Sequence, residues 1–344
     1  MRSITALGFS LCLSLTAAAC ADDGSGGSEG SAASGDGDGQ GARPGWRGLA
    51  PIAGGPRQEH GVVALDGKVY VIAGVGGELL NTGRVEVYDP REDAWSEAAQ
   101  LPMALNHPNV AALNGKIYLL GGMIGEFPWT AVGDAFEYDP GSDTWTEIEP
   151  MPEGTERGSA AVGVEGTKIY LAGGLRSLTP RFQDTVLDVS SYDVATGAWE
   201  ALPDLPEPRD HVGGAVVGST FYVLGGRANG QGNVKDTVFA YDLSERAWST
   251  RAPMPTARGG VAAAVKGDTI YVIGGEGNEE PGALGVFDDN EAYDAARDAW
   301  QELAPMTTPR HGTGAVAVDG AIYVPGGGTQ QGFGSTGVTD AFLP

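Results

Sequence analysis

Short runs of alternating apolar and polar residues, separated by glycine-containing turns, fill most of the chain. His60 to Leu65 alternates in this way, Asp66-Gly67 follows, and Lys68 to Ala73 is the next apolar run. Asp-Gly pairs readily adopt the positive φ angles of a two-residue hairpin turn, so these runs are predicted to be antiparallel strands A and B. Arg84 to Tyr88 predicts strand C, and the segment around Trp95 predicts strand D.

This cassette of four strands recurs six times. Six of the seven tryptophans share one phase, 49 to 54 residues apart: Trp46, Trp95, Trp145, Trp199, Trp248 and Trp300. Trp129 is the one out of phase. A period near fifty that is built from short strands, with no helical unit, indicates a β-propeller. The predicted fold class is therefore all-β, a six-bladed β-propeller of four-stranded antiparallel blades, with Tyr and Trp packed between blades.

The cassettes resemble those of the kelch family. In the second cassette an apolar strand, Ile117 to Leu120, leads into Gly121-Gly122, with Tyr138 and Trp145 downstream. The resemblance covers residues 46 to 344 and has local departures, namely Ala73-Gly74 in the first blade and Pro325 in the last. The second blade also has Leu105 where the other five carry an arginine, at Arg57, Arg157, Arg209, Arg258 and Arg310.

The two ends of the repeat region complement each other. The last cassette supplies strands A to C, ending with Thr339 to Phe342, whereas Trp46 to Pro51 carries a D-strand tryptophan with no A, B or C strand ahead of it. Pairing these segments completes the sixth blade and covers the exposed strand edges. The ring is therefore predicted to be closed by an N-terminal strand.

The first 45 residues predict export and a tether. In residues 1–20 one arginine precedes an apolar run that ends in small residues, which is typical of an export signal and too short for a membrane span. The ending Ala17-Ala18-Ala19-Cys20 resembles a bacterial lipobox, which implies a lipidated Cys20; ordinary cleavage near Ala19 is the alternative. Residues 21–45, rich in Gly, Ser and acidic side chains, predict a flexible tether. The expected location is the bacterial cell envelope, at the outer membrane or cell surface.

Charge limits the classes of binding partner, and cysteine content excludes a disulfide. The chain has 45 acidic and 21 basic residues and a net charge of −24. Such a surface repels phosphate backbones and anionic lipids, so nucleic acid is excluded as a partner and membrane contact is expected only through the lipid. The only cysteines are Cys12 and Cys20, so the mature chain contains no disulfide. A monomer is expected.

Differences in cassette length indicate which face carries function. The intervals that contain the strands, the A-to-B turn and the C-to-D turn have constant length, whereas the B-to-C interval varies from 14 to 18 residues and the D-to-A interval from 10 to 12. Connections of an antiparallel blade alternate between its two ends, so both variable connections emerge on one face. Binding residues of a propeller are expected in those loops.

Two positions per blade are expected near the axis on that face. The residue after the second glycine supplies Arg227 and Glu276, and the residue two after the arginine position supplies Glu59, His107 and His211. In kelch domains that capture peptides the corresponding positions supply contacts, so the resemblance implies a ligand site formed by these five residues. A solvated, mixed-charge rim is the alternative.

Aromatic residues in the second B-to-C loop add one candidate. Trp129, with Phe127 beside it, is either packed on a neighbouring loop or offered as a stacking platform for a sugar or peptide ring. Trp129 therefore joins the candidate ligand-binding residues.

Catalytic and metal sites find little support in the sequence. The predicted propeller contains no cysteine, which excludes the Tyr-Cys copper site of seven-bladed kelch oxidases. The four histidines, at positions 60, 107, 211 and 311, belong to different blades and show no clustered pair, so no metal or cofactor is predicted. We interpret the protein as a binding module for a protein, peptide or glycan rather than an enzyme. The alternative is a sugar mutarotase or epimerase of the sialic-acid (N-acetylneuraminate) type, with Glu276 and Arg227 or a histidine as its acid–base pair.

The anchor is testable by replacing the lipidated thiol. Cys20→Ser is expected to release the protein from membranes without unfolding it, because the tether separates the lipid from the propeller. Fractionation of cells with and without a high-salt wash measures this, and Cys12→Ser, within the signal, serves as the control. A Cys20→Ser protein that stays membrane-bound after the wash contradicts the lipobox interpretation.

Overall fold

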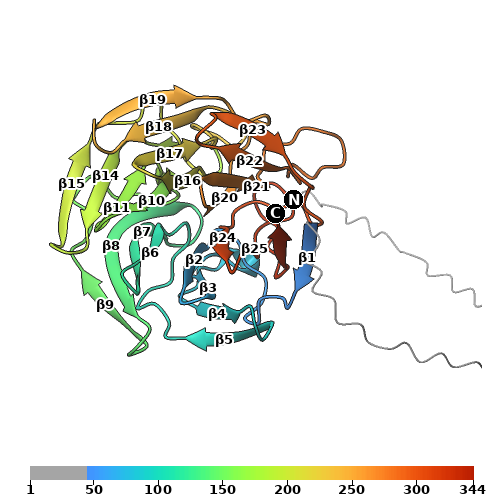
Figure 1. Ribbon diagram of the computed structural model, residues 1–344. Coiled ribbons are helices and arrows are strands. Elements are labelled where there is room, and N and C mark those ends of the chain that lie inside the picture. Colours follow the sequence, from blue (N-terminus) through green and yellow to red (C-terminus); the bar gives the residue numbers. More distant parts are fainter. Residues whose placement is uncertain (1–44) are drawn as a thin grey trace, which may run out of the picture. The chain divides into compact units, whose positions relative to one another are not determined.

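The computed structural model describes residues 45–344, which form six antiparallel blades around a central axis (Figure 1). Within each blade the strands follow one another outward from the axis in the order A to D. The predicted six-bladed, four-stranded propeller is thus confirmed. The predicted signal and almost all of the tether lie outside the described residues. Among the described residues no helix is long and apolar enough to cross a membrane.

The strands match the predicted cassettes closely. Blades one to three contain β2 Gly61–Leu65, β3 Lys68–Ile72, β4 Val85–Asp89 and β5 Ala94–Ala98; β6 Val110–Leu113, β7 Lys116–Ile124, β8 Trp129–Asp139 and β9 Thr144–Ile148; and β10 Ala161–Glu165, β11 Lys168–Ala172, β14 Val189–Asp193 and β15 Ala198–Leu202. Blades four to six contain β16 Gly213–Val217, β17 Thr220–Leu224, β18 Val238–Asp242 and β19 Ala247–Arg251; β20 Ala262–Lys266, β21 Thr269–Ile273, β22 Asn290–Asp294 and β23 Ala299–Glu302; and β24 Val316–Val318, β25 Ala321–Pro325, β26 Thr339–Leu343 and β1 Gly45–Leu49. A short 3-10 turn, η1 Gly77–Leu79, lies in the first B-to-C loop.

One B-to-C loop departs from the four-strand pattern. In blade two β7 and β8 continue past the blade as a long hairpin, and β12 Leu175–Leu178 of blade three pairs with β8. β12 in turn pairs with β13 Gln183–Thr185, so this sheet has six strands, five in the order β13-β12-β8-β7-β6 and β9 paired separately with β8. The extension ties the loops of blades two and three together.

The D-strand tryptophans bind each blade to the one before it. Every indole N–H donates to the backbone carbonyl four residues after the tryptophan of the preceding blade: Trp46 to Ala304 (2.9 Å), Trp95 to Ala50 (2.9 Å), Trp145 to Ala99 (2.8 Å), Trp199 to Glu149 (3.1 Å), Trp248 to Pro203 (2.9 Å) and Trp300 to Ala252 (2.9 Å). Tyrosines pack across the same boundaries, as where the Tyr88 ring lies 5.9 Å from that of Tyr323. The predicted packing between blades is confirmed.

The repeated arginine lies buried inside its own blade, where its partner comes from strand C. Arg57 pairs with Glu86, Arg258 with Glu291 at 2.9 Å and Arg310 with Asp340 at 2.8 Å. Arg157 donates to the Ser190 hydroxyl, and Arg209 lies over the Phe239 ring. A buried guanidinium needs such a partner. The absence of this arginine from blade two has a structural reason. Leu105 and Phe136 replace both members of the pair with apolar side chains, which lie in one core cluster.

The ring closes as predicted, through β1. This strand pairs antiparallel with β26, with Trp46 opposite Phe342, and completes blade six (Figure 1). The Trp46 ring lies 5.2 Å from that of Phe342 and also contacts the core shared with blade five. The closing strand therefore uses the same tryptophan contacts as the five continuous blades.

Three C-to-D turns add a charged link between blades. Asp93, Asp143 and Asp298 each accept a hydrogen bond from the tyrosine hydroxyl of their own blade and from a backbone N–H of the preceding blade. For Asp143 the donors are the Ala99 N–H and the Tyr138 hydroxyl, and both lower the pKa of its carboxyl group. Hydrogen bonds to the charged form act in this direction.

Removing the closing tryptophan tests ring closure. Trp46→Ala is expected to lower the free energy of unfolding by about 1–3 kcal/mol, less than for a fully buried aromatic residue because Trp46 is half-buried. Trp46→Phe keeps most of the packing and loses the indole donor, about 1 kcal/mol. Chemical denaturation measures both, with Arg47→Ala on the exposed side of β1 as control. Unchanged stability of Trp46→Ala contradicts this closure.

Acid titration tests the aspartate link. Asp143→Asn keeps the shape of the side chain and removes its charge, so it is expected to be less stable than wild type at neutral pH. The folded-state pKa of Asp143 is lowered, so this stability difference is present above the unfolded pKa of about 3.9 and disappears as the pH falls through the folded value. Urea unfolding across this range measures the difference, and Asp66→Asn, in an exposed turn, is the control. A difference that grows in acid contradicts the assignment.

Candidate functional site

A ring of left-handed residues surrounds the axis. The residue two after the arginine position has a positive φ in all six blades: Glu59 (52°), His107 (50°), Ser159 (59°), His211 (48°), Gly260 (62°) and Gly312 (61°). Their N–H groups bond from blade to blade, each to the carbonyl of the neighbouring ring residue, except that His211 N–H bonds to the Ser159 hydroxyl. A non-glycine residue pays about 1–2 kcal/mol for this conformation. Such strain clusters at functional sites, which directs attention to these side chains.

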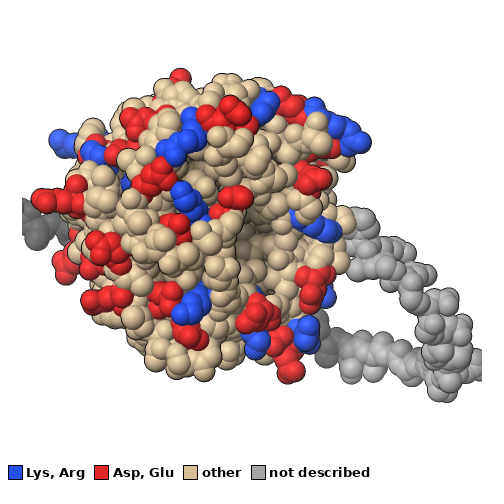
Figure 2. All heavy atoms as spheres, turned by 60° about the vertical axis from the view of Figure 1, so that its left-hand side comes forward, with Lys and Arg blue, Asp and Glu red and all other residues tan. Residues whose placement is uncertain are grey.

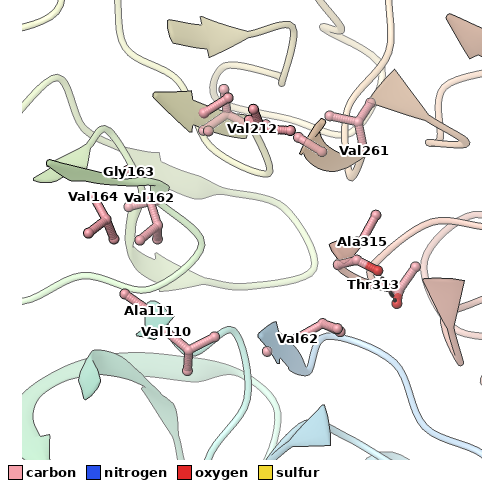
Figure 3. A pocket seen from close by; sticks show the side chains of 18 of the residues that line it. Val62, Val110, Ala111, Val162, Gly163, Val164, Val212, Val261, Thr313 and Ala315 are labelled. Atoms are coloured by element: carbon pink, nitrogen blue, oxygen red, sulfur yellow. Dashed lines mark hydrogen bonds between the residues drawn. The ribbon is translucent and has the colours of Figure 1, made fainter. Parts of the chain in front are cut away.

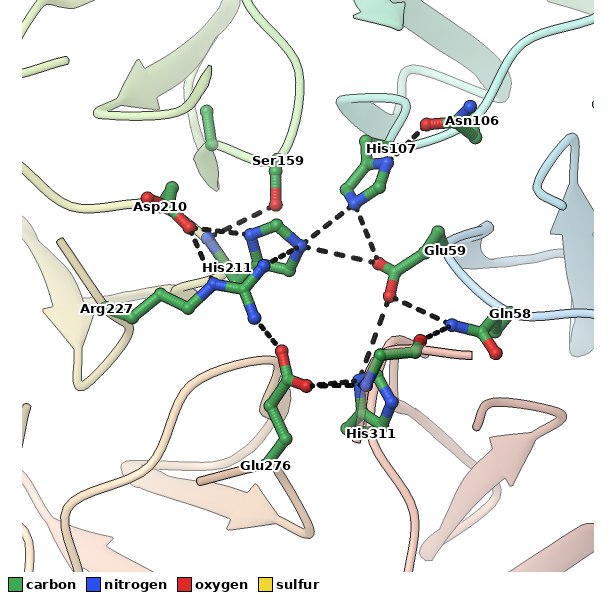
Figure 4. A network of polar contacts seen from close by, with 12 residues as sticks. Gln58, Glu59, Asn106, His107, Ser159, Asp210, His211, Arg227, Glu276 and His311 are labelled. Carbon is green, nitrogen blue, oxygen red and sulfur yellow. Dashed lines mark hydrogen bonds and ion pairs between the residues drawn. The ribbon is translucent and has the colours of Figure 1, made fainter. Parts of the chain in front are cut away.

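The five predicted axial side chains converge (Figure 4). His107 Nε2 lies 2.9 Å from His211 Nε2 and 3.2 Å from Glu59 Oε2. Arg227 pairs with Glu276 and donates from Nη2 to His211 Nε2 at 2.9 Å. Each of the five residues is at most 9% exposed. The alternative of a solvated rim is therefore wrong, and a large ligand on the loop face does not reach these groups in this conformation.

A second set of axial residues was missed by the sequence analysis. It comprises the residue directly after the arginine position, and Gln58, Asn106, Asp210 and His311 are its polar members. Alternation along a strand predicts that neighbouring side chains point to opposite sides. The left-handed residue that follows breaks this alternation, so both side chains face the axis. The signal in the sequence was the repeated polar pair after the arginine.

Three of the four histidines meet at the axis, so the expectation that no histidines cluster was wrong. A propeller brings equivalent segments of every blade to the axis, whatever the distance along the chain, so His107 and His211, two residues after the arginine position, meet His311, one residue after it. His107, His211 and His311 all join the axial cluster. His60 stays outside it and bonds through Nε2 to the Pro325 carbonyl at 2.9 Å. Burial, aided by Arg57, lowers the pKa of His60 to about 3.

Burial dominates the electrostatics of the cluster. It lowers the pKa of His107 and His211 well below the ordinary range, and the nearby Arg227 charge lowers both further. It raises the pKa of Glu59 and Asp210, an effect opposed by Arg227. The imidazoles are therefore neutral at neutral pH and present lone pairs rather than charges.

An aromatic cap, formed by Phe127, Trp129 and Phe333, covers the cluster on the loop side. The three rings lie 5.2 to 5.9 Å apart, and Trp129 also lies 5.5 Å from the His107 ring. Trp129 is 1% exposed. It is thus packed on its neighbours, the first of the two predicted roles, and an exposed stacking platform is ruled out for this conformation.

Space beside the cluster is small on one side and larger on the other. Between the cap and the polar side chains lies a cavity of about 20 Å³, enough for a water molecule or an ion but too small for a sugar ring. On the opposite side, cavities of about 100 and 390 Å³ follow the axis. Small apolar residues in or next to the A strands, such as Val62, Val162 and Val261, line the larger one (Figure 3). The cluster is therefore approached along the axial channel, away from the loop face.

Comparison with known proteins agrees with this architecture. The family profile described as the KLHDC2/KLHL20/DRC7 Kelch-repeats domain matches residues 152–327, and the Kelch motif matches residues 56–102 and 104–152. A solved structure, "Structure of YjhT", superposes with a TM-score of 0.69 at 17% identity, over 84% of this chain and 95% of that one. At this identity the likeness concerns the fold alone.

Two curated relatives have similar sequences. Kelch-like protein terF of Aspergillus terreus is 44% identical over 297 residues, which cover 84% of this chain and 65% of that protein. Kelch-like protein 35 of Mus musculus is 32% identical over 173 residues, 50% of this chain and 27% of that protein. The chain thus spans less than two thirds of the length of either relative. Its six cassettes, its closed ring and the matching family profiles together show that this protein belongs to the kelch-repeat family.

Proposed function

We propose that this chain is an exported, lipid-anchored kelch propeller that binds a partner protein or peptide through its B-to-C loops. One observation carries the binding role. Among the described residues, all five large hydrophobic side chains that are exposed lie in these loops, with exposed fractions of 37 to 66%: Leu80, Phe182, Leu187, Leu284 and Phe333. Hydrophobic groups exposed together on one face mark interaction sites in soluble proteins.

The loops of blades five, six and one offer the best-shaped part of this face. A cavity of about 220 Å³ lies between the first and sixth B-to-C loops, with Leu79 and Phe333 in its lining. Leu284 lies nearby in the fifth loop, whose carbonyl at that residue accepts a hydrogen bond from the Gln331 N–H of the sixth loop. A cavity beside exposed apolar groups suits one anchoring side chain of a partner, the usual centre of a binding hot spot.

The chemistry of the face favours a protein or peptide over a glycan. The exposed groups are leucine and phenylalanine, which gain most from covering apolar surface. On the side of the molecule drawn in Figure 2, acidic and basic side chains are interspersed, with uncharged surface between them. The mutarotase alternative gains no support, because Glu276 and Arg227 are paired with each other beside a cavity of about 20 Å³.

The proposal of export and lipid anchoring rests on the sequence alone. The apolar run of residues 1–20 and the lipobox-like Ala17 to Cys20 support them, and both lie outside the described residues. A tethered propeller at a cell surface would keep its loop face available to partners in the surroundings.

Peptide selection tests the binding face. A random peptide library is panned against the purified Cys20→Ser chain, and the Kd of the tightest peptide is measured by fluorescence polarisation. The double variant Leu284→Ser/Phe333→Ser is expected to bind at least tenfold more weakly, about 1.4 kcal/mol, because it removes anchors from the proposed face.

The control changes polar residues on the opposite face. Asp66→Ser/Asp268→Ser alters two exposed A-to-B turns and is expected to leave the Kd unchanged. Peptides that bind both double variants equally well place the site elsewhere. A glycan array run on the same proteins separates the ligand classes, and binding to glycans alone overturns the proposal of a protein partner.

A further inference from the structure

We propose that Glu59, His107 and His211 form a site for a divalent first-row transition-metal ion such as Zn²⁺. Their atoms Glu59 Oε2, His107 Nε2 and His211 Nε2 form a triangle with sides of 2.9, 3.2 and 3.9 Å. Ligands bound tetrahedrally at 2.0–2.1 Å lie about 3.3 Å apart, so the triangle has the size that one ion requires. The site lies beneath the loop face and is separate from the proposed partner surface.

A chain of hydrogen bonds orients His107. The Gly125 carbonyl can only accept, so it takes the Asn81 amide N–H at 3.0 Å and turns the Asn81 oxygen inward. That oxygen accepts from the Asn106 amide at 2.6 Å, which leaves the Asn106 oxygen facing His107 Nδ1. The imidazole proton therefore lies on Nδ1, and the Nε2 lone pair points at the axis. Such outer hydrogen bonds are the usual support of a metal-binding histidine.

His211 is held in the same way by a carboxylate. Its Nδ1 lies 2.7 Å from Asp210 Oδ1, which accepts the proton and leaves the Nε2 lone pair facing the axis. Arg227 Nη2 donates to this lone pair, so a metal ion competes with one hydrogen bond. The guanidinium remains held elsewhere, because its Nε bonds to Asp210 and its Nη1 to Glu276. For His107 Nε2 the described cluster offers no such donor. Its neighbours there are the lone pair of His211 Nε2 and the Glu59 carboxylate.

His311 adds an independent observation that points to a bound cation. Its Nε2 lies 3.0 Å from the Gln330 carbonyl, which fixes the proton on that side. Its Nδ1 is buried without a hydrogen-bond partner and faces Glu276 Oε2 at 3.6 Å and Glu59 Oε1 at 3.8 Å. His107 and His311 thus direct lone pairs towards carboxylates, and a buried arrangement of acceptors needs a positive centre.

The cluster also has more negatively charged groups than positively charged ones. Glu59, Asp210 and Glu276 contribute three carboxyl groups, whereas Arg227 contributes the one guanidinium in the axial cluster of described residues. A divalent cation balances the excess. Two imidazole nitrogens and one carboxylate oxygen favour zinc or iron(II) over calcium or magnesium, which prefer oxygen ligands. Glu59, His107 and His211 line the axial cavity of about 100 Å³, which provides a route for the ion and room for water beside it.

Metal titration of the full mature chain tests the site. Residues 20–344 with the Cys20→Ser change, which contain no thiol to bind metal, are stripped with chelator and titrated with Zn²⁺ by calorimetry and with Co²⁺ by visible absorption. One ion per chain, Co²⁺ bands typical of nitrogen–oxygen ligands, and a rise in melting temperature with Zn²⁺ are expected. Glu59→Gln and His107→Gln, which approximately preserve side-chain size, are each expected to weaken Zn²⁺ binding at least a hundredfold.

Two further variants separate ligation from folding. His60→Gln changes a buried histidine outside the triangle and is expected to keep the Zn²⁺ affinity. Asp210→Asn keeps the size of its side chain and is expected to weaken binding ten- to a hundredfold, because it disturbs the orientation of His211. Circular dichroism verifies folding of every variant.

Two results overturn the proposal. Absence of stoichiometric Zn²⁺ binding by the parent chain shows that Glu59, His107 and His211 do not form a metal site. Binding that persists in both Glu59→Gln and His107→Gln shows that the ion is held adventitiously elsewhere. Neither result bears on the peptide selection with the loop variants, so the two proposals fail or succeed separately.

Discussion

The indole-to-carbonyl hydrogen bond between neighbouring blades is the contact on which the closed ring depends. It recurs at all six boundaries, and each time the acceptor lies four residues beyond the tryptophan of the preceding blade. Five of these bonds join residues 45 to 50 positions apart, whereas the bond of Trp46 joins residues 258 positions apart, because β1 and β26 of blade six come from opposite ends of the propeller sequence. Because the donor is identical there, closure by β1 reproduces the geometry of the other blades and leaves β26 of blade six without an unpaired edge.

The inner radius imposes a different constraint. Six copies of one backbone position meet around the axis, where left-handed residues bond from blade to blade. Side chains of the ring residues point to the axis. Because they are buried there, every polar group without a hydrogen-bond partner destabilises the fold. Glu59, the three histidines and Arg227 therefore form one connected cluster. Imidazole lone pairs in that cluster that have no hydrogen-bond donor are the reason for proposing a bound cation.

The B-to-C loops take part neither in the tryptophan contacts between blades nor in the ring of left-handed residues. They vary in length and carry the exposed leucines and phenylalanines, while the tryptophan contacts and the axial ring hold their bases in place. The aromatic cap of Phe127, Trp129 and Phe333 separates this face from the axial cluster. A partner on the loops and an ion in the axis would thus occupy different levels of one rigid support, with entry from opposite ends.

The sequence by itself determined the blades, their strands and the closing segment, because turn chemistry, strand alternation and the phase of the tryptophans are local signals. It also selected Glu59, His107, His211, Arg227 and Glu276 as axial neighbours, since equal repeat positions must meet at the centre of a ring. Only the tertiary structure decided that these groups are buried, that Trp129 is part of a cap, and that Asp210 and His311 join the cluster. Those outcomes depend on left-handed backbone geometry and on contacts between residues from different blades, which no local pattern encodes.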